Sequence, residues 1–190
     1  MAENVKVNVG GNYKELDKGY VNIGGVWKEL DKIWVNIGGV WKEVGLELVL
    51  SYYGTATASS VKRVDYAGAS VGDYALFGGG RDWNAVDAYN TSLVRSTPTA
   101  LSLGRYLLAG ASVGDYALFG GGNGAGINSN TVDAYNTSLV RSTPTTLSPA
   151  RRTLAGASVG DYALFGGGDN GSYSNVVDAY NTSLVRSTPT

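Results

Sequence analysis

The chain has 190 residues, a formal net charge of −1, 43% hydrophobic residues, and neither cysteine nor histidine. The near-neutral charge disfavours nucleic acid and anionic membrane surfaces as partners, while the missing cysteine and histidine exclude disulfides, thiolate nucleophiles, imidazole bases and the commonest zinc ligands. Glycine accounts for 28 residues, roughly double its usual share of about 7%, which favours short strands and tight turns, and we expect no cofactor and no metal.

Hydropathy points to a chain that works outside the bilayer. No stretch approaches the roughly 18 consecutive apolar residues of a membrane-spanning helix. The first residues, Met1 to Lys6, lack the apolar run of a signal peptide. The sequence therefore predicts a soluble chain without a signal peptide and without a membrane partner.

Three short repeats occupy residues 7–44. Each joins two apolar runs through a Gly-Gly pair, as in VNIGGVW at 21–27. Such a pair is a strong signal for a two-residue β-hairpin, because glycine adopts positive φ without steric cost, and we expect Ile23 to lie opposite Val26. A lone hairpin is marginally stable in water, so residues 1–45 are predicted to pack as a hairpin-repeat stem or cap.

Residues 46–66 precede a second, longer repeat. Arg63 aligns with Arg105 and Arg151 of that repeat, which places 48–57 where the repeat has its last strand. We therefore expect a remnant outer strand and a connector over 46–66. Three roles remain open for it: a fifth strand of a sheet, a strand that displaces the last strand of a partner chain, or a connector only.

The long repeat occurs three times over residues 67–190. Its first block, AGASVGDYALFGGG, starts at 67, 109 and 155, and its second block, VDAYNTSLVRSTPT, starts at 86, 132 and 177. The Gly-Asp dipeptide predicts a hairpin, Tyr-Ala-Leu-Phe a strand covered on both faces, and Asn-Thr-Ser a second turn. Four short antiparallel strands in about 45 residues are the pattern of one propeller blade.

The order of these features resembles kelch repeats, in which Leu-Phe-Gly-Gly closes the second strand, a tyrosine such as Tyr89 follows in the third, and Arg105 comes after a Pro-Thr segment. The resemblance implies an all-β fold with three four-stranded kelch-like propeller blades over 67–190. One position departs from it, because arginine stands where kelch blades usually carry a tryptophan that packs between blades. We expect these guanidinium groups to stack on an aromatic ring instead. The arginines are Arg95, Arg141 and Arg186.

Three blades leave a ring incomplete. An open stack of repeats exposes an apolar face at each end, and kelch rings usually hold six or seven blades. The resemblance therefore implies a half-propeller whose ring is completed by oligomerisation. We expect a homodimer with a six-bladed ring.

The VNIGGVWKE-type unit at 21–29 resembles short hairpin repeats of bacteriophage tail and fibre proteins, where such repeats act as spacers between an attachment end and a tip. This resemblance implies a location in a virion tail and a cell-surface receptor or glycan as partner. A shaft of this kind would make a trimer the alternative to the dimer.

Carboxylates are the only catalytic material in the sequence. Asp73 and Asp87 recur in every long repeat, and identical copies have near-identical environments, whereas an acid–base pair needs two environments that separate two pKa values. We expect these aspartates to cap turns and bond within strands. Asp82 and Asp169 lie in loops that differ between repeats.

The long repeats differ in two stretches, one between the second and third strands and one between successive blades. Because antiparallel strands alternate in direction, both stretches are predicted to emerge on one rim, opposite the invariant turns. Variable loops on a rigid scaffold are typical of binding proteins, although surface loops also drift neutrally. The residue types common at binding hot spots occur on this rim at Arg81, Trp83, Tyr106, Arg152 and Tyr173.

The sequence thus predicts a non-enzymatic binding or structural module that presents variable loops to a receptor or glycan. Two alternatives stay open. One is a propeller glycosidase that uses the loop carboxylates of Asp82 and Asp169, and the other is an engineered or duplicated repeat protein without a ligand.

Overall fold

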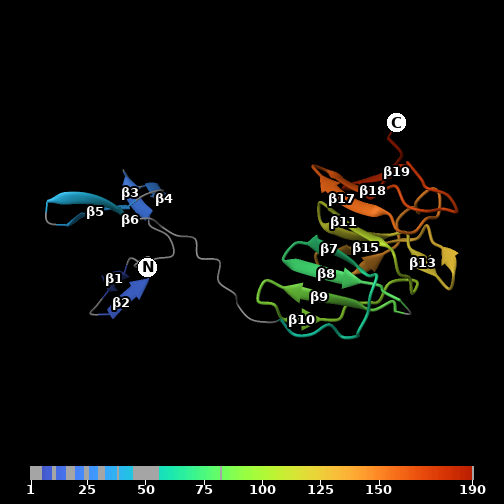
Figure 1. The fold of residues 1–190 in the computed structure, drawn as a ribbon, viewed down its shortest axis with the longest axis horizontal. Coiled ribbons are helices and arrows are strands. Elements are labelled where there is room, and N and C mark those ends of the chain that lie inside the picture. The colour runs from blue at the N-terminus through green and yellow to red at the C-terminus, as the bar shows by residue number, and fades with distance from the viewer. Residues whose placement is uncertain are drawn as a thin grey trace. The chain divides into compact units, whose positions relative to one another are not determined.

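The structure is a computed structural model that describes residues 6–9, 12–15, 20–23, 26–29, 33–37, 39–44, 56–81 and 83–189. The chain divides into two units, Met1–Gly54 and Thr55–Thr190 (Figure 1). Every regular element in the described ranges is a β-strand. None of these residues forms a helix that could cross a membrane.

The first unit contains three antiparallel hairpins. They pair β1 (Lys6–Val9) with β2 (Asn12–Glu15), β3 (Tyr20–Ile23) with β4 (Val26–Glu29), and β5 (Ile33–Ile37) with β6 (Val40–Val44). Ile23 lies opposite Val26, as the Gly-Gly signal predicts. The expected boundary near Gly45 and most of the expected remnant strand, residues 48–55, lie outside the described residues.

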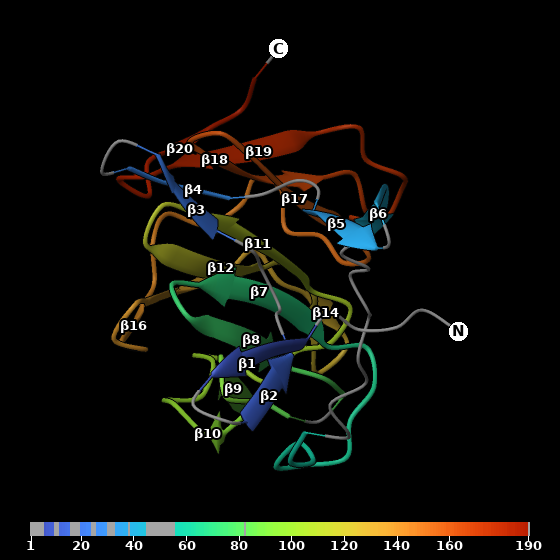
Figure 2. The ribbon, with the colours of Figure 1, turned by 90° about the vertical axis from the view of Figure 1, so that its left-hand side faces the viewer.

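The second unit contains three four-stranded antiparallel sheets, each with its strands in sequence order. Figures 1 and 2 show the sheets following one another from green to red. The first sheet contains β7 (Ala67–Val71), β8 (Tyr74–Gly78), β9 (Val86–Asn90) and β10 (Arg95–Ser96). The second contains β11 (Ala109–Val113), β12 (Tyr116–Gly120), β15 (Val132–Asn136) and β16 (Arg141–Ser142). The third contains β17 (Ala155–Val159), β18 (Tyr162–Gly166), β19 (Val177–Asn181) and β20 (Arg186–Ser187).

Both turns predicted within each long repeat are present. In the first sheet, Val71 lies opposite Tyr74 across the two-residue loop, and Gly72 has a φ of 49°, a conformation that glycine adopts at little cost. In the Asn-Thr-Ser turn, the Asn90 side-chain oxygen accepts hydrogen bonds from the backbone N–H groups two and four residues later. Local side-chain capping of this kind is why asparagine favours turns.

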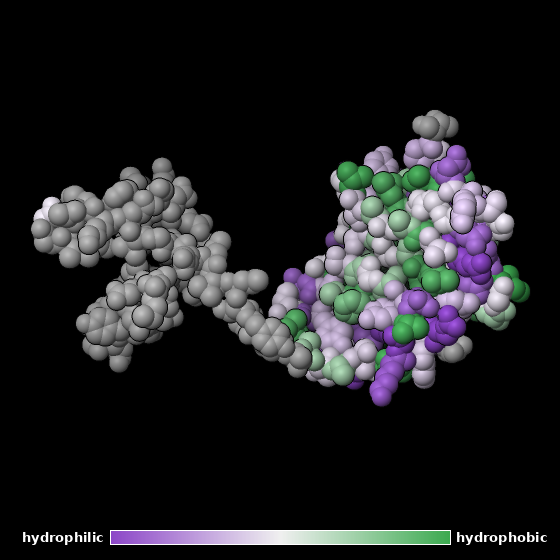
Figure 3. Space-filling model, in the orientation of Figure 1, coloured by the Kyte–Doolittle hydropathy of each residue, from purple (hydrophilic) through white to green (hydrophobic). Residues whose placement is uncertain are grey.

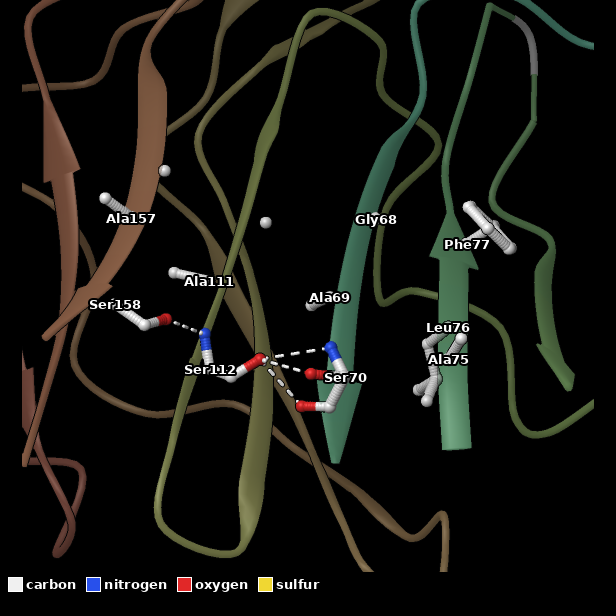
Figure 4. A pocket seen from close by; sticks show the side chains of 12 residues that line it. Gly68, Ala69, Ser70, Ala75, Leu76, Phe77, Ala111, Ser112, Ala157 and Ser158 are labelled. Atoms are coloured by element: carbon white, nitrogen blue, oxygen red, sulfur yellow. Dashed lines mark hydrogen bonds between the residues drawn. The ribbon is translucent and has the colours of Figure 1, made fainter. Parts of the chain in front are cut away.

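The innermost strands β7, β11 and β17 lie side by side, joined by serines (Figure 4). The Ser70 N–H donates to Ser112 Oγ at 3.0 Å, and the Ser112 N–H donates to Ser158 Oγ at 2.8 Å. A Cβ on Gly110 would collide with the Gly68 carbonyl oxygen. Small residues at this edge therefore allow the sheets to converge on a common axis, which gives the unit its propeller-type arrangement.

An apolar core fills each space between adjacent sheets. Phe119 of the second sheet packs on the first, where it belongs to the cluster around Leu76, and Phe165 of the third sheet packs on the second, in the cluster around Leu118. All four side chains have 0% exposure. Burying one such side chain contributes about 1.5–3 kcal/mol, so the contacts between sheets are a main source of stability.

A buried arginine–aspartate cluster joins each sheet to the connection that precedes it. Asp133 accepts from Arg105 at 2.6 Å and from Arg141 at 3.2 Å, and the Ser102 N–H donates to the same carboxylate at 3.0 Å. Arg63 makes the corresponding contact with Asp87 at 2.6 Å. The alignment of Arg63 with the later repeats is therefore confirmed.

The expectation that the strand arginines stack on aromatic rings is wrong. Arg141 lies across from Tyr135 in the strand pairing, yet its guanidinium binds the Asp133 carboxylate. Arg186 binds Asp178 at 2.7 Å in the same way. The carboxylates of Asp133 and Asp178 are fully buried, and a charge-assisted hydrogen bond from a guanidinium to such a group is roughly twice as strong as a neutral one.

Residues 56–66 follow the path that the later connections between sheets take. The Tyr89 hydroxyl donates to the Thr57 carbonyl at 2.7 Å. The tyrosines at the equivalent position of the other sheets donate to Thr99 and Thr145 at the same distance. Thr57 thus gives the first sheet the hydrogen-bond acceptor that Thr99 and Thr145, which follow the preceding sheets, give to the second and third.

Candidate functional site

The two variable stretches meet on one rim of the second unit, as predicted. Tyr106, in the connection after the first sheet, forms an antiparallel bridge with Asn123, which follows β12. Arg152 and Asp169 form the same bridge one repeat later. In Figure 1 this rim lies at the right, next to β13, and Figure 3 shows that hydrophilic residues gather on that side. Backbone pairing therefore holds the variable loops in fixed positions.

One cluster on the rim is built around Arg81 and Tyr106. The Arg81 guanidinium carbon lies 5.0 Å from the centre of the Tyr106 ring, a cation–π distance. Its Nη2 atom is 3.5 Å from Asp65 Oδ2, and the Arg81 side chain is 61% exposed. Trp83 is 42% exposed, and a Cβ on Gly104 would lie 3.6 Å from the Trp83 carbonyl carbon. This cluster presents a guanidinium and the Trp83 side chain to solvent, with the half-buried Tyr106 ring against the guanidinium.

A second cluster is built around Asp169. Both Nε and Nη2 of Arg152 donate to Asp169 Oδ2, at 3.2 and 2.9 Å, and the Gly171 N–H donates to Oδ1 at 2.8 Å. The Gly171 hydrogen bond, followed by Arg152, lowers the pKa of Asp169 below its ordinary range. Tyr173 bridges back to Asp169 and is 99% exposed. The loop thus holds a carboxylate with a lowered pKa close in sequence to an uncovered aromatic ring.

A polar groove of about 600 Å³ lies beside this second cluster. One side comes from β13 (Asn123–Gly124) and β14 (Ile127–Asn128), a small hairpin inserted in the second repeat. Asn128 Nδ2 donates to the Asp169 carbonyl at 3.0 Å, and Ile127 is 74% exposed. The groove is lined by Gly126, Ile127, Asn128, Ala150, Arg152, Asp169, Asn170 and Gly171.

The five predicted residues do not share one pocket. Arg81 contacts Tyr106 in the first cluster, while Arg152 and Tyr173 belong to the second. Sequence reasoning missed Ile127 and Asn128, which line the groove. The loop between the second and third strands is longer in the second repeat than in the first, and this extra length could have pointed to them.

The glycosidase alternative needs Asp82 and Asp169 to act as an acid–base pair. Asp82 lies outside the described residues, so its distance from Asp169 is not defined. The donors to Asp169 lower its pKa, which favours the charged carboxylate as a fixed anion and disfavours it as a general acid or general base near neutral pH. Within the described ranges, no group of three or more histidine, cysteine, aspartate or glutamate residues could hold a metal.

A hollow of about 360 Å³ lies along the innermost strands (Figure 4). Its lining consists of glycine, alanine and serine residues of β7, β11 and β17, together with Ala75, Leu76 and Phe77 of β8. These side chains include no titratable group. The hollow therefore offers no acid–base or nucleophilic pair, in contrast to the rim.

Comparison with known proteins identifies the fold only. No family model matches the chain, and no curated protein matches it. Among 137 matching chains of solved structures is that of YjhT, with a TM-score of 0.59 and 16% sequence identity over 74% of this chain. YjhT has a propeller-type fold, and this chain spans 47% of its length. The second unit is therefore all-β and of propeller type.

Proposed function

We propose that the chain is a non-enzymatic binding module in which three kelch-like blades form half of a ring that a second copy completes. The variable rim contacts a cell-surface receptor or glycan. The observation that carries this proposal is the set of exposed aromatic and arginine side chains on the variable loops, several of which are linked to one another by backbone bridges.

The chemistry of the rim suits a sugar. Trp83 and Tyr173 offer exposed aromatic faces, and such faces pack against flat apolar surfaces, which pyranose rings also provide. The groove beside Tyr173 supplies donors and acceptors from Arg152, Asp169 and Asn170. A binding site that combines apolar faces with a few fixed polar groups is typical of ligand recognition.

Two observations support the proposed half-ring. The second unit contains three four-stranded sheets, and the chain corresponds to 47% of the propeller-type YjhT chain. The first unit is proposed to be a tail- or fibre-type spacer. Its support is the series of short hairpins that follow the VNIGGVWKE-type repeats.

A glycan array tests the proposed binding. Replacement of Trp83 or Tyr173 by alanine is expected to weaken binding by about tenfold or more, since truncation of an aromatic hot spot costs about 2 kcal/mol. Ser138→Ala, in the invariant turn on the opposite rim, is the matched control. Unchanged binding in both aromatic variants would refute this site, and turnover of a chromogenic glycoside that is lost in Asp82→Asn would favour a glycosidase.

A further inference from the structure

The two contacts between sheets inside the chain are copies of one another. The Phe119 ring lies over Gly78, where an added Cβ would be 3.2 Å away, and the Phe165 ring lies over Gly120, where it would be 2.9 Å away. On the opposite rim, the Thr137 methyl packs on the hairpin glycine of the first sheet, and an added Cβ there would be 3.3 Å from it. Each contact thus joins side chains of one sheet to glycines of the sheet before it.

Backbone hydrogen bonds repeat with the same period. The Gly80 N–H donates to the Arg105 carbonyl at 3.0 Å, and the Gly122 N–H donates to the Arg151 carbonyl at 2.9 Å. A second series runs along the connections, where the Leu107 N–H donates to Asp65 and the Thr153 N–H donates to Leu107, both at 2.9 Å. Each series stops at the first and third sheets among the described residues.

The first and third sheets each expose one of the two surfaces that form this contact inside the chain. The face of the first sheet that carries Phe77 is here called the leading face, and the face of the third sheet that carries Val159 and Tyr162 is called the trailing face. Phe77 is 36% exposed, whereas its equivalents are fully buried. Val159 is 61% exposed, whereas its equivalent Val113 is 2% exposed. Within the part of the chain that the structure describes, each end sheet therefore lacks, on one face, the neighbouring sheet that the second sheet has on both.

We infer that the leading face of one copy docks on the trailing face of a second copy, head to tail, and that two such contacts close the ring. The inference rests on the ring proposed above and specifies its interface. Phe77 would lie over Gly166 of the second copy, as Phe119 lies over Gly78. Among the described residues, a Cβ on Gly166 would meet only Val177, at 3.6 Å, so no described side chain covers this glycine as Phe119 covers Gly78.

The direction of docking follows from complementarity. If two leading faces paired, the two Phe77 side chains would face each other. If two trailing faces paired, the two Gly166 positions would face each other and nothing would fill the space over them. In the head-to-tail arrangement, the Arg63 carbonyl of the copy that contributes Phe77 would lie at the Gly168 N–H of the other copy. This contact continues the series of backbone hydrogen bonds. A heterologous contact that closes after two copies gives twofold symmetry with identical interfaces. A second copy is the occupant whose surface already matches, because the repeats are identical in sequence.

Two glycine substitutions are designed to block the contact between copies while leaving the contacts between sheets of one chain intact. Gly68→Ala adds a Cβ whose nearest neighbour in the described ranges would be Phe77 Cδ1 at 3.5 Å, an ordinary contact. In the docked pair the same Cβ would collide with the Gly156 carbonyl of the second copy, as a Cβ on Gly110 would collide with the Gly68 carbonyl. Gly166→Leu blocks the position of the incoming Phe77. Neither glycine has a positive φ, so each chain keeps its fold. Circular dichroism and thermal unfolding verify this.

Light scattering of the separate and mixed variants tests the inference. Each variant alone is expected to be a single chain of 19.8 kDa, because every head-to-tail contact is blocked. An equimolar mixture is expected to form a two-chain species of about 40 kDa through its one unblocked contact. Phe77→Glu and Tyr162→Glu form a second pair that repeats the test without altering glycine.

Two results would overturn the inference. A variant that remains a two-chain species alone would show like faces pairing or another interface, and variants that stay single when mixed would exclude the head-to-tail contact. These masses are measured without a sugar. A rim that binds no glycan therefore leaves them unchanged and counts only against the proposed ligand.

Discussion

Replacement of Arg105 by methionine is expected to lower the free energy of unfolding by about 3–5 kcal/mol, because removing one partner of a buried ion pair is strongly destabilising. The buried Asp133 charge would keep only the partly exposed Arg141 as a counter-charge. Arg105 and Asp133 have 0% side-chain exposure and lie 2.6 Å apart. Arg105 also donates to the carbonyls of Thr131 and Phe119, which would lose their donor. Urea unfolding at pH 7 measures the loss.

Arg81→Met is the control for this prediction. The Arg81 side chain is 61% exposed and its ion pair with Asp65 spans 3.5 Å, so its loss is expected to cost at most about 1 kcal/mol. Equal effects of the two substitutions would contradict the assignment of the buried cluster as a structural element that joins sheets.

Phe119→Ala is expected to cost about 3–5 kcal/mol, the usual range when a buried phenylalanine is truncated to alanine. The ring has 0% exposure, lies over Gly78, and meets the Tyr135 ring edge to face at 6.0 Å. Its removal would open a cavity between the first and second sheets. Chemical unfolding monitored by tyrosine and tryptophan fluorescence measures the change.

Phe77→Ala is the matched control, since the two phenylalanines occupy the same position of identical blocks. Phe77 is 36% exposed and packs on Tyr66 and Tyr89. At a dilution where only single chains are present, its truncation should cost less than half as much as that of Phe119. A larger loss in Phe77→Ala would contradict the leading face as an uncovered surface.

The identical repeats made the sheets predictable. Gly-Asp and Asn-Thr-Ser are local signals, and local backbone preference decides turns. The hairpins at Gly72 and Asn90 are therefore present as predicted. The long-range alignment of Arg63 with Arg105 also holds, because both arginines bind the aspartate of the following sheet.

The role of the strand arginines was not predictable in the same way. Arg141 and Asp133 are eight residues apart, and only the register of β16 on β15 brings them together. A single sequence gives no register for a two-residue strand. Stacking on an aromatic ring and pairing with a carboxylate were therefore indistinguishable before the sheet was known.

The side of the second unit that carries the variable loops could be predicted from the sequence, but the groove on that side could not. Alternation of strand direction placed Tyr106 and Arg152 on one side, and both lie in bridges there. The groove, however, depends on a hairpin inside the longer loop of the second repeat, which exposes Ile127 and brings Asn128 into a hydrogen bond with Asp169 in the loop of the third repeat. Loop conformation of this kind follows from tertiary contacts rather than local preference.

The mass of the unmodified chain in solution is the most direct test of the central claim, that this half-ring is completed by its own copy. Native mass spectrometry at micromolar concentration is predicted to give a species of about 40 kDa, because the leading face of each copy covers the trailing face of the other. A single species of 19.8 kDa would contradict the account.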